Sequence, residues 1–315
     1  MISEKSGKVI KGLGGLYTTR VEEDGEIKIL TCRAKGALHR DEEKVIIGDN
    51  VKITVDDGTP DGIVISEILP RKNSLIRPPM ANLDYLFIVF ASKKPTPVLE
   101  VVDKLIAISI HNKITPVAVI SKSDLGESAA EEYCEIYKRA GVEAFITSSA
   151  EGEGVEELRR YISENVREGK TAAFAGASGV GKSTLMNSLF PTLNLATSDI
   201  SRKIERGKHT TRHVEIFDIV APDFKNGFLA DTPGFSLVDF ARFDFFSLEE
   251  LGATFPDISA HAHGCRYQDC AHVGEGIEDC AVARAESLGL ISPSRLESYR
   301  AIYKVLKEKS KNEYK

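Results

Sequence analysis

A glycine-rich segment, GASGVGKST at residues 176–184, limits the folds open to this chain more than any other feature. It follows the apolar run TAAFA and leads into STLMNSLF, whose spacing predicts a helix. Between a strand and a helix, such glycines let backbone N–H groups face phosphate oxygens, and the helix N-terminus adds positive potential. The alternative is a glycine-rich turn without a ligand. The expected phosphate contacts are Gly176, Ala177, Ser178, Gly179, Val180, Gly181, Lys182, Ser183 and Thr184.

Residues further along the chain predict a magnesium ion beside this loop. Asp231, in the sequence DTPG, ends an apolar run, where a carboxylate can hold the magnesium shell while the Gly234 amide faces the last phosphate. The same four residues are also typical of a turn. The polar stretch between loop and DTPG carries Thr210 and Thr211, and either can reach the ion once triphosphate is bound. The expected magnesium ligands are Ser183, Thr211 (or Thr210) and Asp231.

Two segments earlier in the chain predict recognition of guanine. SKSD, at residues 121–124, follows the strand-like PVAVI, and the Asp124 carboxylate can accept hydrogen bonds from the N1–H and the N2 amine of guanine. The stem of Lys122 can lie along the base. TSSAEGEG, at residues 147–154, follows the strand-like AFIT, and the backbone of Ser149 and Ala150 is expected to contact the guanine carbonyl oxygen. The alternative for SKSD is a solvated Ser/Asp turn.

The order of these segments is the reverse of the usual GTPase order, because the base-reading segments precede the phosphate loop. A circular permutation, in which the old ends are joined and new ends are opened elsewhere, explains the order without changing the sheet. Ser121 stands where many GTPases carry an Asn that braces the phosphate loop. We expect the serine to brace it less well, with only moderate nucleotide affinity.

The remaining pattern predicts three domains. Residues 1–72 hold about five short strands with Gly-rich turns, typical of an OB-type β-barrel, although a barrel that only packs on its neighbour explains the pattern as well. Residues 73–240 alternate strand-like and helix-like segments, as in an α/β P-loop domain. Residues 241–315 are mainly helical, with Ser292 and Pro293 predicted to start the last helix and the Lys-rich end expected to be frayed or exposed.

A cysteine and histidine cluster in the last domain predicts a structural zinc ion. Cys265, Cys270, His272 and Cys280 offer three thiolates and one imidazole, enough for a closed tetrahedral site with no catalytic role. Cys280 is the least certain ligand, because seven residues separate it from His272. His261 and His263 are alternative ligands, and a solvated or RNA-facing histidine is the other interpretation of each. Cys32 and Cys134 lie outside any motif and are expected to be packing residues.

Composition indicates the cellular location and the kinds of partner to expect, but not the reaction. The five cysteines and the absence of an apolar run long enough to span a bilayer predict a cytoplasmic protein with no membrane partner. A net charge of −6 argues against a general nucleic-acid coat, but it is compatible with a local basic face that binds RNA.

Taken in order, the barrel, SKSD, SSAEG, GASGVGKST, GKHTTRH, DTPGF and the Cys/His module closely resemble the RsgA family of circularly permuted bacterial GTPases. The family usually leaves five residues where this chain has seven before Cys280. The resemblance covers nearly the whole chain. It implies GTP hydrolysis stimulated by the small ribosomal subunit, a role in late maturation of that subunit, and contacts of the barrel and the zinc domain with ribosomal RNA or protein. GTP and GDP with Mg²⁺, one structural Zn²⁺ and a monomeric state are expected.

The sequence also limits the catalytic step. Phe235 stands where many GTPases place a Gln that orients the attacking water, so intrinsic hydrolysis should be slow. His209, beside the switch threonines, is the candidate catalytic residue, and a surface histidine is the alternative. Two rival functions remain at this point: a P-loop ATPase or small-molecule kinase with an accidental SKSD, and an RNA-binding or zinc scaffold with a vestigial nucleotide loop.

Overall fold

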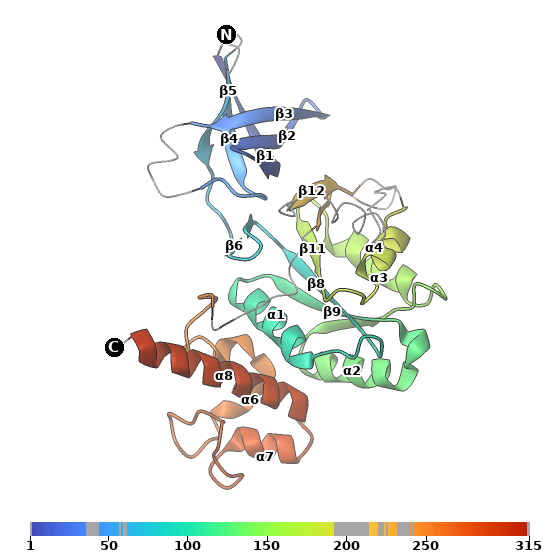
Figure 1. Cartoon of the computed structure of the whole chain (residues 1–315), viewed down its shortest axis with the longest axis vertical. Helices are drawn as coiled ribbons and strands as arrows, with labels where there is room; N and C mark the ends of the chain where they lie inside the picture. Colours follow the sequence, from blue (N-terminus) through green and yellow to red (C-terminus); the bar gives the residue numbers. More distant parts are fainter. Residues whose placement is uncertain are drawn as a thin grey trace, which may run out of the picture. The chain divides into compact units, whose positions relative to one another are not determined.

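The computed structural model (Figure 1) describes residues 2–35, 44–56, 58, 62–191, 214–219, 224, 226–231, 240 and 242–313. The chain divides into two compact units. The first consists of Met1–Asp84, Ser163–Ala173 and Ser198–Gly234, and the second of Tyr85–Ile162, Phe174–Thr197 and Phe235–Lys315. Because each unit draws on separate stretches of sequence, each is described by itself.

A closed barrel of five strands forms most of the first unit. Its strands are β1 (Ile2–Leu13), β2 (Leu16–Glu23), β3 (Glu26–Ala34), β4 (Asn50–Asp56) and β5 (Ile63–Ile68). They follow the order β1-β2-β3-β5-β4, in which only β3 and β5 run parallel. Alternate side chains point inward and form a core of Val9, Val21, Cys32, Val45, Val51, Ile53 and Ile65. This is the predicted OB-type barrel, and Cys32 is the predicted packing residue.

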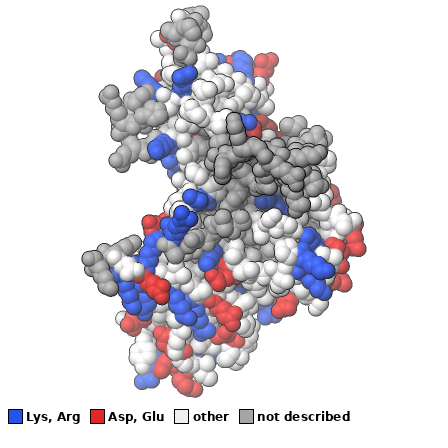
Figure 2. All heavy atoms as spheres, viewed as in Figure 1, with Lys and Arg blue, Asp and Glu red and all other residues white. Residues whose placement is uncertain are grey.

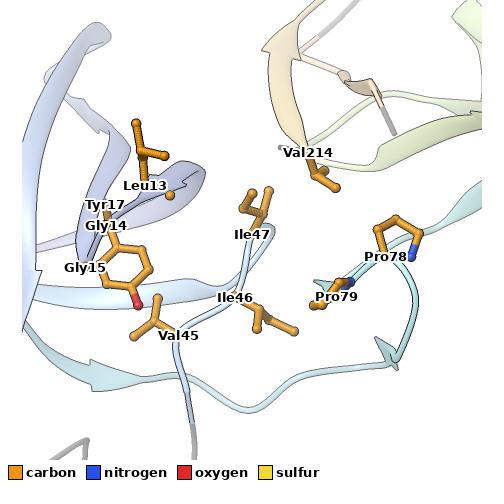
Figure 3. Close-up of a pocket in the computed structure, with 11 residues that line it drawn as sticks. Leu13, Gly14, Gly15, Tyr17, Val45, Ile46, Ile47, Pro78, Pro79 and Val214 are labelled. Carbon is orange, nitrogen blue, oxygen red and sulfur yellow. The ribbon is translucent and has the colours of Figure 1, made fainter. Parts of the chain in front are cut away.

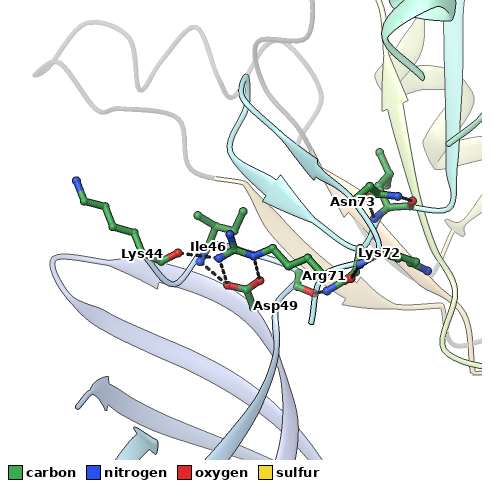
Figure 4. A network of polar contacts seen from close by, with 9 residues as sticks. Lys44, Ile46, Asp49, Arg71, Lys72 and Asn73 are labelled. Atoms are coloured by element: carbon green, nitrogen blue, oxygen red, sulfur yellow. Dashed lines mark hydrogen bonds and ion pairs between the residues drawn. The ribbon is translucent and has the colours of Figure 1, made fainter. Parts of the chain in front are cut away.

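The segment that leaves the barrel is fastened back onto it (Figure 4). It contains the short strands β6 (Ser74–Leu75) and β7 (Met80–Ala81). The Arg71 guanidinium donates from Nε and Nη2 to the two carboxylate oxygens of Asp49, at 2.6 and 2.9 Å, and Asp49 is fully buried. Asn82 Nδ2 donates to the Gly48 carbonyl at 2.9 Å, and Asn73 and Leu83 exchange two hydrogen bonds. The segment that follows the barrel is therefore anchored by these hydrogen bonds.

Three further strands belong wholly or partly to the first unit. They are β11 (Thr171–Ala175), β12 (Glu215–Asp218) and β13 (Phe228–Asp231); β13 pairs with β11 in parallel and with β12 antiparallel. The barrel contacts this group through Arg20, which donates to Asp218 at 2.6 Å and lies over the Phe228 ring. Lys11 pairs with Glu215 at 3.1 Å. The sequence pattern did not predict β12, a strand of only four residues.

The second unit contains the predicted α/β alternation. Strands β8 (Tyr85–Ala91), β9 (Thr115–Ser121) and β10 (Glu143–Ile146) run parallel in the order β10-β9-β8. The helices between and after them are α1 (Leu99–His111), α2 (Glu127–Arg139), α3 (Val155–Asn165), whose last turn enters the first unit, and α4 (Lys182–Leu189). From Leu86 to Ala91 every residue of β8 is buried, which explains its continuous apolar sequence.

Three short helical segments and one long helix follow in the C-terminal part. They are the 3-10 turn η3 (Gly252–Thr254), α6 (Pro256–Ala262), α7 (Ala281–Ser287) and α8 (Pro293–Glu313). Pro293 is the first residue of α8, as predicted. The helix continues to Glu313, and most lysines of its last turns are exposed, so of the two expectations for this end the structure shows exposure and not early fraying. The barrel, the α/β region and the C-terminal helices confirm the predicted fold class, while the boundaries at residues 72 and 240 stay a prediction. Among the described helices, none combines the length and the apolar character that a bilayer crossing requires.

A buried ion pair connects α8 to α1 and α6. Arg295, which is 1% exposed, donates to Asp103 at 2.7 Å and with two nitrogens to Asp257 at 2.9 and 3.1 Å. Its guanidinium carbon also lies 4.6 Å from the centre of the Phe255 ring. Neither Arg295 nor Asp103 belongs to a recognisable motif, so this contact could not be predicted from the sequence.

Arg295→Ala should lower the free energy of unfolding by about 3–5 kcal/mol, because it leaves two buried carboxylates without their counter-charge. Denaturant unfolding of the whole chain measures the change. Arg139, which pairs with Glu135 on the exposed face of α2, offers a matched control, and Arg139→Ala should cost less than about 1 kcal/mol. Equal effects of the two substitutions would show that the buried pair contributes little.

Candidate functional site

The glycine-rich segment forms a loop between the end of β11 and the start of α4. Gly176 has φ +156°, and a Cβ there would lie 2.3 Å from the Val89 carbonyl oxygen, so only glycine fits. Gly181, with φ +90°, precedes Lys182, the first residue of α4. Residues 177–179 are exposed, whereas the Val180 side chain is buried and anchors the loop. The strand-loop-helix setting predicted from the sequence is confirmed, with exposed backbone at the position expected to face phosphate.

The SKSD segment lies directly against this loop. Ser121 is the last residue of β9, and its hydroxyl donates to the Val180 carbonyl at 2.6 Å, with the Phe90 carbonyl at 3.2 Å. Lys122 Nζ donates to the Gly179 carbonyl at 2.6 Å. Two segments far apart in the sequence are therefore held together by side-chain to backbone hydrogen bonds. The short Ser121 side chain was expected to brace the loop weakly, yet it reaches a loop carbonyl directly.

Asp124 is oriented by a serine that the sequence analysis missed. Asp124 lies in the 3-10 turn η1 (Ser123–Leu125), and Ser148 Oγ donates to its Oδ1 at 2.7 Å. Ser148 is fully buried, and Ser149 and Ala150 follow it in the turn after β10. Because Asp124 itself is exposed, this bond fixes its carboxylate without removing it from solvent. In the sequence Ser148 is adjacent to Ser149, and nothing there distinguishes the serine whose hydroxyl binds Asp124.

Several candidate residues cannot be placed. Thr210, Thr211, Gly234, Phe235 and His209 lie outside the described residues. Asp231 ends β13, where its backbone pairs in register with Glu215, but its side chain is also outside the described part of the chain. Ser183 lies in the first turn of α4 and is half-buried. Their magnesium and catalytic roles stay predictions.

The four candidate zinc ligands form one cluster. The ligand atoms of Cys265, Cys270, His272 and Cys280 all lie within 4.8 Å of one another. His272 Nδ1 is 3.4 Å from the sulfurs of Cys270 and Cys280 and 3.6 Å from that of Cys265. Tetrahedral zinc, with bonds of about 2.3 Å to sulfur and 2.0 Å to nitrogen, places its ligands roughly 3.5–3.8 Å apart. The cluster therefore fits a closed zinc site, and this group includes neither His261 nor His263.

The surroundings of the cluster favour metal binding. Burial lowers the pKa of His272 below its ordinary value, which favours the neutral imidazole that binds metal. The His272 carbonyl accepts a hydrogen bond from Arg300 of α8 at 2.9 Å. Cys280 is buried at the start of α7, where its sulfur accepts a hydrogen bond from the Ala283 amide. Helices on both sides thus hold the ligands in place.

The long spacing before Cys280 is accommodated by a compact loop. The Glu275 carboxylate accepts hydrogen bonds from the amides of Ala271, Val273 and Gly274, at 2.9–3.2 Å. Burial alone would raise the pKa of Glu275, but these backbone bonds lower it overall, so the loop favours the carboxylate form. The seven residues therefore turn back on themselves and bring Cys280 to the cluster.

The first unit also contains an apolar pocket of about 380 Å³ (Figure 3). Residues of its wall include Leu13, Tyr17, Ile46, Ile47, Pro78 and Pro79. Its described lining carries no charged side chain. Because phosphate binding requires donors or cations, this pocket does not suit the phosphates of a nucleotide.

Ser121→Ala should weaken GDP binding about fivefold, since it removes the hydrogen bond that holds the Val180 carbonyl of the loop. Equilibrium titration with a fluorescent GDP analogue measures the change. Ser188, in α4, is a suitable control, because its hydroxyl also donates to a backbone carbonyl, that of Thr184 in the same helix. If Ser121→Ala and Ser188→Ala both left GDP binding unchanged, the serine would not brace the loop.

Comparison with known proteins gives consistent results along the chain. The family model for the RsgA GTPase matches residues 68–241, and that for the RsgA N-terminal domain matches residues 6–64. A protein of Agathobacter rectalis named small ribosomal subunit biogenesis GTPase RsgA is 38% identical, over 97% of this chain and 99% of its own length. A protein of the same name from Geobacillus thermodenitrificans is also 38% identical, over 96% and 98%.

Two solved structures resemble the whole chain. One is described as the crystal structure of YloQ, a circularly permuted GTPase; its TM-score is 0.74 at 30% identity, covering 98% of this chain and 96% of that one. The other is YjeQ from Thermotoga maritima, with a TM-score of 0.75 at 30% identity, covering 96% and 99%. The likeness therefore extends through the barrel, the α/β region and the C-terminal helices.

Proposed function

The chain belongs to the RsgA family of circularly permuted GTPases and is a GTP hydrolase, and on that premise we propose that it acts in late maturation of the small ribosomal subunit. In this proposal the subunit stimulates hydrolysis, and hydrolysis is coupled to release. The full-length relatives carry the name small ribosomal subunit biogenesis GTPase, which supports this assignment. We further propose that the protein works as a cytoplasmic monomer.

One observation carries the nucleotide part of the proposal. The base-reading segment is bonded to the phosphate loop through Ser121 to Val180 and Lys122 to Gly179, each at 2.6 Å. We assign Asp124 to guanine N1–H and N2, Ser149 and Ala150 to the guanine carbonyl oxygen, and residues 176–184 to the phosphates. An accidental SKSD would have no reason to be bonded to the phosphate loop, so this contact argues against the ATPase and kinase alternatives.

The magnesium and catalytic roles complete the proposed mechanism. Magnesium would neutralise charge that develops on the phosphates, held by Ser183, Thr211 and Asp231. Phe235 cannot polarise water, and we assign this task to His209 when the protein is bound to the small subunit. On this account the isolated protein hydrolyses GTP slowly.

We propose that the barrel and the C-terminal module bind ribosomal RNA. Figure 2 shows basic and acidic side chains interspersed on the face drawn, so RNA contact would rest on local basic clusters rather than on net charge. The basic segment 202–212 and two exposed residues of the segment after the barrel, Lys72 and Arg77, are candidates. Binding through such clusters should weaken as salt is added.

The experiment that tests the proposal is turnover of GTP and of ATP, each with and without purified small ribosomal subunits. We expect slow GTP hydrolysis that rises at least tenfold, and by roughly a hundredfold if His209 acts as the general base, when subunits are added. Preference for ATP would overturn the assignment of SKSD to guanine. GTP hydrolysis that is indifferent to the subunit would leave the GTPase intact and overturn the ribosomal role.

A further inference from the structure

Lys122, which connects the base-reading segment to the phosphate loop, has an unfavourable backbone conformation. Its φ and ψ are 58° and 42°, in the left-handed region. This region is unfavourable for a residue with a Cβ, and such residues persist where neighbouring groups hold them in place. A lysine side chain does not offset this cost by a hydrogen bond to the nearby backbone, as an Asn or Asp side chain can. The contacts that hold this residue therefore decide where its side chain lies.

The segment just after β8 supplies those contacts at the backbone end. Ser92 is 2% exposed, and its hydroxyl donates to the Lys122 carbonyl at 2.7 Å. The Ser92 amide donates to the Ser121 carbonyl at 2.8 Å, so both groups of Ser92 bind adjacent peptide units. Within η1, the same Lys122 carbonyl also accepts from the Leu125 amide at 3.0 Å. Ser92 thus fixes the peptide that sets the direction of the Lys122 side chain.

The same segment also binds the other end of Lys122. Lys122 Nζ donates to the Lys94 carbonyl at 2.7 Å and to the Gly179 carbonyl at 2.6 Å. Residues 92–94 therefore hold Lys122 at its carbonyl and at its ammonium, while the ammonium reaches the phosphate loop. With both ends fixed, the methylene stem of Lys122 has little freedom to leave the position beside a bound base.

Resting on the proposed assignment of SKSD to guanine, we propose that Ser92 is a positioning residue for guanine nucleotides, acting through Lys122. Nothing in the glycine-rich loop or in SKSD points to it, because it follows a different strand, β8, and lies 30 positions from Lys122. Its contribution is made equally to the bound substrate and to the transition state, since the base does not change during hydrolysis. Loss of the Ser92 hydroxyl should therefore change affinity and KM and leave kcat unaltered.

The test is Ser92→Ala in the full chain, with fluorescent GDP titration and GTP turnover measured side by side. We expect GDP to bind about fivefold to tenfold more weakly and KM for GTP to rise by a similar factor. Ser109 gives the matched control: it is fully buried, its hydroxyl donates to the Leu105 carbonyl at 2.8 Å, and it lies in α1 of the same unit. Ser109→Ala should leave GDP affinity within twofold of the wild type.

A double-mutant cycle separates positioning from general destabilisation. Lys122→Ala alone should weaken GDP binding, and adding Ser92→Ala to it should cause no further loss, because the side chain that Ser92 positions is gone. Full additivity of the two substitutions would overturn the inference. So would an equal loss of affinity in Ser109→Ala, a fall in kcat without a change in KM, or wild-type affinity in Ser92→Ala.

Discussion

Asp124→Asn should reduce the affinity of the protein for GTP by at least about a hundredfold while raising its affinity for XTP. The Asp124 carboxylate is the proposed acceptor of two guanine hydrogen bonds, and bonds to a charged group contribute about 1.5–3 kcal/mol each. An amide at this position turns one acceptor into a donor, which opposes the N2 amine of guanine but suits the carbonyl oxygen that xanthine carries there. Competition titrations with GTP, XTP and ATP measure the exchange.

Glu127 provides the control for this substitution. It lies three residues further along, in the first turn of α2, and is exposed as Asp124 is. Glu127→Gln makes the same change of charge and should leave GTP affinity within twofold. Unchanged GTP binding in Asp124→Asn would remove the guanine assignment of SKSD, whereas parallel losses of GTP and ATP would mean that the substitution had damaged the site as a whole.

Cys280→Ser should abolish stoichiometric zinc binding and unfold the C-terminal module. The wild-type chain is expected to hold one zinc ion, and zinc in closed four-ligand sites contributes apparent binding free energies of about 10–16 kcal/mol near neutral pH. Much of that energy should be folding energy here, because Cys280 starts α7 and the His272 carbonyl is bonded to Arg300 of α8. Metal analysis and circular dichroism measure the two losses.

Cys134 is the matched control for the metal substitution. It is buried in α2, where its sulfur contacts the Ala144 carbonyl, and it lies outside the cluster. Cys134→Ser should keep the zinc and the helical signal. Retention of a full equivalent of zinc by Cys280→Ser would exclude this cysteine as a ligand. Zinc loss from both variants would indicate a general loss of folding.

Much of the site could be predicted because its signals are local. The glycine loop is read from adjacent residues, since the backbone angles it needs admit few other side chains; Gly176 is the clearest case, because a Cβ there would meet the Val89 carbonyl. The Cys/His spacing is local in the same sense. The strands and helices of the α/β region follow from hydrophobic periodicity with the exception of β12, whereas the equally short β10 and β13 lie in apolar runs that indicate them.

The contacts that hold the site together could not be predicted in this way. The bond from Ser121 to Val180 joins residues 59 positions apart, and Arg295 and Asp103 are 192 positions apart. A buried serine hydroxyl has no sequence signature, because its role depends on which carbonyl the fold brings within reach. For the same reason the sequence indicated Ser149 but not Ser148, and suggested a weak brace at Ser121 where the structure shows a short hydrogen bond.

The anchored segment after the barrel has a consequence for how this region opens. A free linker is cut readily by proteases because it can adopt the extended shape that a protease needs. Here that shape requires breaking the paired bonds of Arg71 to buried Asp49 and the amide bonds of Asn73 and Asn82. Residues 71–83 should therefore resist limited proteolysis until the barrel itself unfolds. For the same reason, this segment and the barrel should exchange their amide hydrogens as one cooperative unit.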